Sequence, residues 1–224
     1  MKKVFPYLVY AVAFPLLAIG GAFVFKDKFY AWVTIAAVLL ACLPFFIRFE
    51  KKETDAKTLI LIAVMIALSV VGRFIFAPLP GFKPVTAMTV LTAMYFGSDA
   101  GFMTGALTAV ISNFYFGQGP WTPFQMFSWG IIGLLAGIFA EKLKKSKVFL
   151  SIFGALSGIL YSLLMDIWTV LWADGYFNFA RYLAALVSSL QFTVIYAVSN
   201  VIFLLLLSKP TGKILQRVKT KYGI

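Results

Sequence analysis

Apolar residues run through this chain in long blocks, and only short polar segments separate them. Most blocks approach the ~20 residues that an α-helix needs to cross a bilayer. The longest polar stretches, 48–57, 141–147 and 208–224, are short enough to be loops or a tail. We therefore predict an all-α, polytopic membrane protein without a separate soluble domain. Its eight expected spans are 4–25, 29–48, 57–77, 84–97, 99–117, 124–140, 148–172 and 182–207.

The basic residues divide unequally between the two sides once these spans are threaded through a membrane. With both termini in the cytoplasm, 15 of the 20 lysines and arginines lie inside and 5 lie outside. The positive-inside bias produces this asymmetry, so we expect a multi-pass protein of the bacterial inner membrane. The outer residues are Lys26, Lys28, Arg73, Lys83 and Arg181. The inner ones are Lys2, Lys3, Arg48, Lys51, Lys52, Lys57, Lys142, Lys144, Lys145, Lys147, Lys209, Lys213, Arg217, Lys219 and Lys221.

The composition excludes several functional classes. Hydrophobic residues make up 62% of the chain and charged residues 12%, against about 25% charged in a soluble domain. The net charge of +12 invites a nucleic-acid interpretation, but the basic residues lie beside membrane ends and form no continuous stripe. We attribute them to anchoring and to attraction for anionic membrane lipid, and we expect no nucleic-acid partner.

Residues that carry enzyme chemistry are scarce. Histidine is absent, which removes the commonest general base and the commonest metal ligand. The single cysteine, Cys42, lies inside an apolar segment, so neither a disulfide framework nor a metal-binding spacing is present. Nucleotide-binding, zinc-protease and serine-hydrolase signatures are also missing. We expect neither an enzyme nor a metal site, and no permanently bound cofactor.

A polar segment, RFEKKETDAK at 48–57, divides the chain in two. We predict a transmembrane hairpin over 1–50 and a six-helix substrate-binding body with a basic cytoplasmic tail over 51–224. Asp55 is a candidate N-cap for the third helix. Pro78, Pro80 and Gly81 should end that helix. The fourth helix is short and has a proline-rich entrance, which is typical of a span that does not cross the full bilayer.

Small residues recur at four-residue spacing, as in faces that let helices approach closely in lipid. Such pairs occur at Gly101 and Gly105, at Gly154 and Gly158, and at Ala63 and Ala67. Packing between helices of this chain explains most of these faces.

Asp166 is a carboxylate well inside a predicted span. A carboxylate there costs about 2.5–3.5 kcal/mol on insertion scales, so it should turn inward and be paired. We expect a buried polar anchor near an outward-facing pocket, with Arg73 and Arg181 as the candidates for the partner charge. Proton coupling is disfavoured, because the chain has no histidine and no second carboxylate at that depth.

Polar and aromatic residues gather on the predicted outer face. A headgroup belt explains some of the aromatic ones. Asn113 and Gln125 flank the Gly/Pro-rich loop 117–123 from two successive helices, where each can donate hydrogen bonds into a cavity. Apolar walls with a few converging polar groups are what a small-molecule pocket requires. The candidate substrate-binding residues are Arg73, Lys83, Asn113, Trp121, Gln125, Asp166, Trp172, Tyr176 and Arg181.

Two runs carry a resemblance to a known family, GRFIFAPLPGFKPVTAMTVLTAMYFG at 72–97 and GFMTGALTAVISNFYFGQGPWTPFQMFSWGIIGLLAG at 101–137. They resemble the substrate-binding S-components of energy-coupling factor (ECF) vitamin importers. The GPWTPFQM-type loop before a glycine-rich helix looks most like the group implicated in cobalamin uptake. The resemblance covers the six-helix body, and the N-terminal hairpin departs from the usual six-helix plan.

The resemblance implies a subunit that binds a vitamin from outside and works with an ECF transmembrane coupling protein and two cytoplasmic ATPase subunits. Family members contact the coupling protein through an Ala-x-x-x-Ala face on the first helix of the body, a place that Ala63 and Ala67 occupy here. Cobalamin or a related corrinoid is the expected transported ligand. Another vitamin or a deazapurine precursor is an alternative, and the competing class is a membrane-embedded enzyme that uses Asp166.

Overall fold

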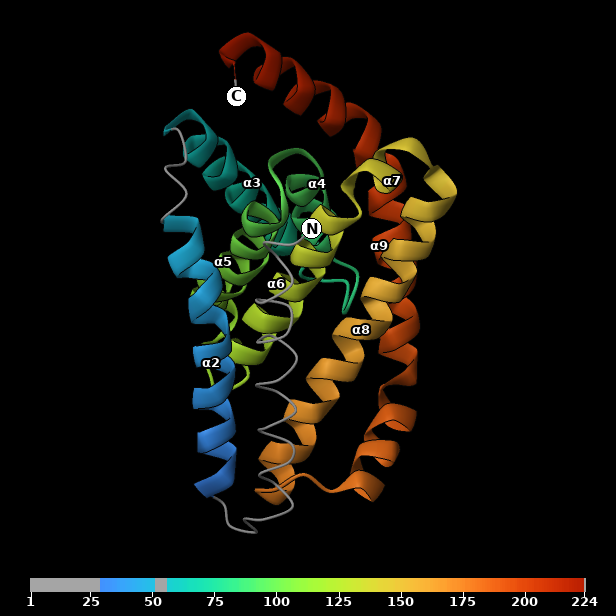
Figure 1. Cartoon of the computed structure of the whole chain (residues 1–224). Helices are drawn as coiled ribbons and strands as arrows, with labels where there is room; N and C mark the ends of the chain where they lie inside the picture. Colours follow the sequence, from blue (N-terminus) through green and yellow to red (C-terminus); the bar gives the residue numbers. More distant parts are fainter. Residues whose placement is uncertain (1–28, 51–55, 224) are drawn as a thin grey trace.

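The computed structural model describes residues 29–50 and 56–223, and all regular secondary structure within them is helical. This confirms the all-α prediction for the described part. The expected span 4–25 and the candidate cap Asp55 lie outside the described residues. The helices (Figure 1) are α2 (Phe29–Glu50), α3 (Ala56–Ile75), α4 (Val85–Phe96), α5 (Ser98–Phe116), α6 (Thr122–Ile138), α7 (Ala140–Lys145), α8 (Lys147–Asp174) and α9 (Phe179–Tyr222).

Most predicted spans agree with a helix to within a few residues, but two boundaries differ. The expected span 124–140 divides at Phe139, whose φ of −94° and ψ of 11° leave helical geometry, and α7 follows. The expected tail after residue 207 instead continues as helix through Pro210 to Tyr222. A proline inside a helix removes one backbone hydrogen bond and bends the axis. Figure 1 shows the last part of α9 crossing the end of the bundle at an angle.

Helix α4 lies at the centre of the bundle. Its 12 residues extend roughly 18 Å, well below the ~30 Å of a bilayer core. Helices α3, α5, α6 and α9 all contact it, and its residues from Val85 to Ala87 and from Thr89 to Met94 are buried. Gly97, at a φ of 94°, then turns the chain directly into α5. The expected short fourth helix is therefore confirmed.

Glycines allow the closest helix pairs to meet. A Cβ on Gly101 of α5 would lie 2.7 Å from the carbonyl oxygen of Gly133 on α6. A Cβ on Gly158 of α8 would lie 2.5 Å from the backbone nitrogen of Ala197 on α9. Both distances are shorter than a side-chain contact tolerates. The glycine faces of α5, α6 and α8 are therefore packing faces within this chain, as predicted.

On helix α3 the small residues do not face the bundle. Ile62, Met65, Ile66, Ser69 and Val70 face the bundle and are buried. Ala63 and Ala67 are exposed, as are the large apolar side chains next to them on the same surface. The alanine pair therefore belongs to the outer surface of α3.

Three described helices are long and apolar enough to cross a membrane, namely α3, α8 and α9. Basic residues gather where α3 begins and α9 ends. Lys57 Nζ donates to the carbonyl oxygen of Tyr222 at 3.5 Å, and Lys219 Nζ donates to that of Tyr95 at 2.8 Å. We call this side, which includes α7, the basic end of the molecule. The total of eight spans remains a prediction.

Candidate functional site

A cavity of about 160 Å³ lies between five helices and one loop. The last turn of α3, the loop 76–84, α4, the first turns of α6 and the middles of α8 and α9 all contribute to its wall. Its lining residues are Arg73, Gly81, Lys83, Val85, Thr86, Gln125, Trp129, Tyr161, Tyr196 and Asn200. No carboxylate is among them, so the wall carries two cationic groups and no acidic one.

Arg73 extends from the last turn of α3 and is held by neutral partners. Its Nη1 donates to Asn113 Oδ1 at 2.8 Å and to Ser112 Oγ. The guanidinium also lies over two aromatic rings, 4.6 Å from the centre of Phe116 and 5.3 Å from that of Trp129. Such contacts stabilise a cation without neutralising it. The positive charge of Arg73 therefore remains available to a ligand.

Asn113 connects this cation to the rest of the wall. Its side chain is 1% exposed, and every polar atom of it is engaged. Oδ1 accepts from Arg73, while Nδ2 donates to Thr122 Oγ1 at 2.9 Å and to Gln125 Oε1 at 2.8 Å. Because an amide has one accepting and one donating end, the cation fixes its orientation. Asn113 thereby orients Gln125 from behind the cavity.

Aromatic side chains form another part of the wall. The rings of Trp129 and Tyr161 stack with centroids 5.0 Å apart and an interplanar angle of 16°, and Tyr196 meets Tyr161 edge-on at 5.2 Å. Gln125 Nε2 donates to the Tyr161 hydroxyl at 3.4 Å. Aromatic rings in such arrangements offer both flat faces and polar tips to a bound molecule. The wall is therefore suited to a planar ligand.

Lys83 supplies the second cation from the loop 76–84. Its Nζ donates to the carbonyl oxygens of Phe76 at 2.7 Å and Ala77 at 3.2 Å. Its backbone is held to α9, because its N–H donates to Ser199 Oγ at 3.0 Å and its carbonyl accepts from the same hydroxyl. Partial burial, and secondarily the nearby charge of Arg73, lower the pKa of Lys83. Two positive charges in one partly buried site repel each other, and an electron-rich ligand bound between them would relieve this repulsion.

The structure brings together four of the nine predicted site residues. Arg73, Lys83 and Gln125 line the cavity, and Asn113 supports two of them. The other five lie outside the cavity wall, so their role in binding remains a prediction. They are Trp121, Asp166, Trp172, Tyr176 and Arg181.

The prediction that an arginine pairs with Asp166 was wrong. Its carboxylate accepts a hydrogen bond from Ser189 Oγ at 2.6 Å, across the contact between α8 and α9. Arg73 is engaged with Asn113, and Arg181 Nε instead lies 2.6 Å from the carboxylate of Asp174. Asp166 faces α9, and the residue of α9 that lies opposite is a serine. The carboxyl is therefore part of the polar contact between two neighbouring helices.

Three of the remaining predicted residues, Trp121, Trp172 and Tyr176, pack against aromatic and apolar side chains outside the cavity. The ring of Trp121 lies where a Cβ on Gly119 would stand and packs with a separate apolar cluster. Trp172, at 53% exposed, packs at a tilt beside Trp168, and Tyr176 packs against the same cluster as Trp121. These three side chains therefore contact other parts of the chain and not the cavity.

Sequence reasoning missed seven of the ten lining residues, namely Gly81, Val85, Thr86, Trp129, Tyr161, Tyr196 and Asn200. A usable signal existed for Asn200, because an amide inside an apolar span is expected to face protein rather than lipid. Tyr196 stands one turn before it on the same face of α9. For Trp129 and Tyr161 the sequence offers no such signal, since an aromatic ring in a span also suits lipid or core. No group of three or more potential metal ligands occurs in the described part of the chain.

A family model described as "ECF-type riboflavin transporter, S component" matches residues 53–216. The chain belongs to this family. The match spans the six-helix body and every residue of the cavity, and it confirms the predicted class of S-component. It also agrees with the lack of enzyme signatures, because the family is one of transporter components.

One curated relative is a UPF0397 protein of Vibrio atlanticus, which is 31% identical over 90 residues. The aligned part is 38% of this chain and 49% of the relative, so the chain spans about half the length of that protein. The relative's name states no ligand. No solved structure gave a significant match.

Proposed function

We propose that this S-component binds a planar heteroaromatic vitamin rich in hydrogen-bond acceptors, with riboflavin as the first candidate, and delivers it inward with a coupling protein and two ATPase subunits. The observation that carries the proposal is the pair of cations, Arg73 and Lys83, beside the stacked rings of Trp129 and Tyr161. The description of the family, which names a riboflavin transporter, supports the same ligand.

The lining selects for ligand chemistry in a definite way. Guanidinium and ammonium groups are donors only, so they favour ring carbonyls, ring nitrogens or an anionic group. Flat rings gain by stacking on Trp129 or Tyr161. A cationic vitamin would meet two positive charges and no carboxylate. The lining thus favours an electron-rich ring system.

Cavity size bears on the choice between candidates. The volume of about 160 Å³ is below the ~300–1,000 Å³ typical of pockets for drug-sized ligands. It is better matched to a single fused ring system than to a corrinoid, which would need a much wider basin. A deazapurine precursor fits the same chemical class as a flavin ring. Cobalamin, the ligand that the sequence resemblance favours, is therefore the second ligand to test.

The positions of the elements suggest how binding and delivery are divided. The cavity lies where α3 ends and α6 begins, away from the basic end. From the positive-inside rule we propose that it opens toward the outside. Ala63 and Ala67 are exposed on α3 and lie closer to its start than Arg73 does, and a coupling helix can approach closely there. We propose that ligand binding and docking to the coupling protein use separate surfaces of this chain.

The test is a titration of the purified full chain in detergent, without ATP or partners. Riboflavin is followed by its fluorescence, cobalamin by its visible absorbance, and a deazapurine precursor by calorimetry. We expect saturable binding of a planar ligand, weakened about tenfold or more by Gln125→Ala, which removes a polar lining contact. Gln191→Ala makes the same change at an exposed position of α9 outside the lining and serves as the matched control. Saturable binding of cobalamin with none of the planar ligands would overturn the ligand class.

A further inference from the structure

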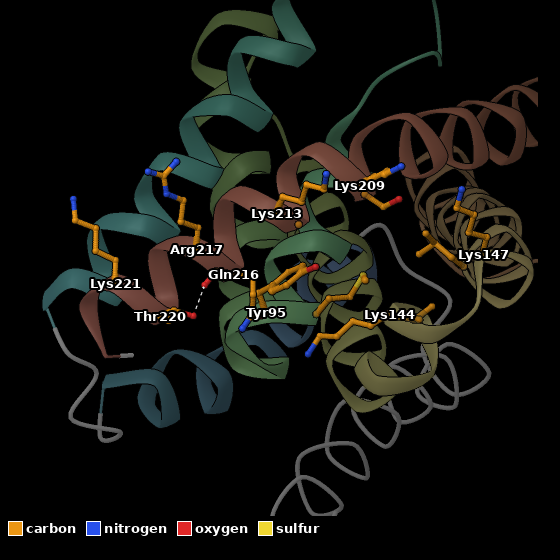
Figure 2. Close-up of a pocket in the computed structure, with 14 residues that line it drawn as sticks. Tyr95, Lys144, Lys147, Lys209, Lys213, Gln216, Arg217, Thr220 and Lys221 are labelled. Atoms are coloured by element: carbon orange, nitrogen blue, oxygen red, sulfur yellow. Dashed lines mark hydrogen bonds between the residues drawn. The ribbon is translucent and has the colours of Figure 1, made fainter.

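A second and larger cavity, of about 900 Å³, opens at the basic end (Figure 2). It lies between the end of α4, α7, the start of α8 and the part of α9 around and beyond Pro210. The cavity of about 160 Å³, which is the proposed vitamin site and is called the vitamin cavity below, shares no lining residue with it. Its lining residues are Met94, Tyr95, Leu143, Lys144, Lys147, Leu150, Ser208, Lys209, Gly212, Lys213, Gln216, Arg217, Thr220 and Lys221.

The bend in α9 is held in place by contacts with the end of α4. Lys219 Nζ donates to the Tyr95 carbonyl oxygen at 2.8 Å. A Cβ on Gly212 would collide with the Tyr95 hydroxyl, so the helix passes directly over this ring. Lys144 lies over the other side of the cavity, with its Nζ 5.3 Å from the centre of the same ring. Specific contacts between α4, α7 and α9 therefore shape this cavity, which we call the recess.

Positive charge is concentrated on one face of this part of α9. Lys209, Lys213, Arg217 and Lys221 follow one another at four-residue intervals, and all line the cavity. Like charges at this spacing destabilise a helix by about 0.2–0.5 kcal/mol per pair. Such a row is favourable when an anion lies against it.

The cations of the recess are largely unneutralised within the described part of the chain. No carboxylate lines the cavity. Lys144 pairs with Glu141, at 3.0 Å, on the exposed surface of α7. Within the described residues, no hydrogen bond or ion pair engages the side-chain cations of Lys147, Lys209, Lys213 or Arg217. The recess thus combines a strong positive potential with no internal counter-charge.

The floor of the recess is apolar. Leu143 and Leu150 are each 2% exposed, and Met94 and the ring of Tyr95 lie beside them. A hydrated inorganic ion gains nothing from such a floor, whereas the first methylenes of a lipid chain do. A recess also admits a headgroup more readily than it admits the convex surface of a protein. Anionic charge and apolar surface together point to an amphiphile.

We propose that this recess binds the phosphate of an anionic phospholipid, such as phosphatidylglycerol, from the cytoplasmic leaflet. The basic row on α9 contacts the phosphate, and the glycerol backbone and upper chain lie over the apolar floor. The inference rests on the proposed orientation, in which the basic end faces the cytoplasm. Juxtamembrane basic segments are attracted to anionic leaflets in the same way. Here the fold adds a defined recess, and the bound lipid holds the last part of α9 against α4 and α7.

The experiment measures lipid binding to the delipidated full chain by native mass spectrometry. Palmitoyl-oleoyl phosphatidylglycerol is titrated in parallel with the matching phosphatidylcholine. The recess variant is Lys213→Gln with Arg217→Gln. The matched control is Lys142→Gln with Lys145→Gln, which removes the same charge from exposed α7 positions outside the lining.

We expect phosphatidylglycerol to bind the recess variant about 20- to 30-fold more weakly than the parent, since each basic side chain near an anionic surface contributes roughly fivefold. The control variant should bind it like the parent, and phosphatidylcholine should bind weakly throughout. Lys213→Arg with Arg217→Lys preserves the charges and should retain binding, which separates loss of charge from misfolding. Excess inorganic phosphate should not displace the lipid.

Three results would overturn the proposal. Equal weakening in the recess and control variants would indicate attraction by net charge alone. Ready displacement by inorganic phosphate would indicate a simple anion site. Parent-like lipid binding in the recess variant, together with loss of the coupling protein on co-purification, would assign the recess to an acidic partner protein. Titration of the same variants with riboflavin keeps this test separate from the proposed function, because the vitamin cavity is untouched by them.

Discussion

Replacing Asn113 with aspartate tests whether the free charge of Arg73 determines ligand binding. The new carboxylate would stand where Oδ1 now accepts from Arg73 at 2.8 Å. It would therefore neutralise the guanidinium while keeping the same shape. The vitamin cavity itself should not change in volume, because Asn113 lies behind its wall.

The size of the effect follows from the hydrogen bonds. A bond from a charged donor contributes about 1.5–3 kcal/mol, against about 0.5–1.5 for a neutral one. Pairing Arg73 with a carboxylate should therefore weaken ligand binding by about 1–2 kcal/mol, roughly fivefold to thirtyfold in Kd. An aspartate also cannot donate to Gln125 Oε1, as Asn113 does at 2.8 Å. We expect the Gln125 amide to turn over, so that its NH₂ group donates to the carboxylate.

The assay is a riboflavin titration of Asn113→Asp beside the parent protein, with thermal unfolding measured in parallel. Asn178→Asp is the matched control. Asn178 caps α9 by accepting from the Arg181 N–H at 3.2 Å, and aspartate caps helices equally well. The control thus makes the same change in charge away from the cavity. Parent-like affinity in a stably folded Asn113→Asp protein would refute the role of the Arg73 charge, as would an equal loss in both variants.

Three further predictions concern other parts of the chain. Ala63→Trp or Ala67→Trp should block uptake in cells but leave vitamin binding intact, because both positions are exposed; loss of binding, or normal uptake, would contradict the docking role. Gly158→Leu should lower the unfolding free energy by about 1–3 kcal/mol, since a Cβ there lies 2.5 Å from the α9 backbone; a parent-like melting temperature would contradict it. Vitamin affinity should fall as rising pH removes the Lys83 proton, at a pH below the ordinary pKa of 10.5, because burial and Arg73 lower that pKa. Lys83→Arg should abolish this fall, and a persistent fall in that variant would exclude Lys83 as its source.

The sequence by itself determined the class of the protein and most of its helices. Length and apolarity are local properties, so the spans that became α3, α5 and α8 were readable residue by residue. Polar residues in apolar surroundings are equally visible, because lipid forces them toward protein. Arg73, Lys83, Asn113 and Gln125 were found because they gather on the predicted outer face, at the ends of spans and in the loops between them. The identity of the family followed from motif runs in the same region.

Only the tertiary structure decided which side chains meet. Asp166 pairs with Ser189 because of how α8 and α9 are rotated against each other, and no local pattern specifies that rotation. Tyr161 and Trp129 form one wall because α8 and α6 bring them together, although an aromatic ring in a span suits lipid, core and site equally. The basic recess depends on the bend after Pro210, which turns an apparent tail over the end of the bundle. Each of these features is a contact between distant segments, and its free energy exists only once the helices have packed.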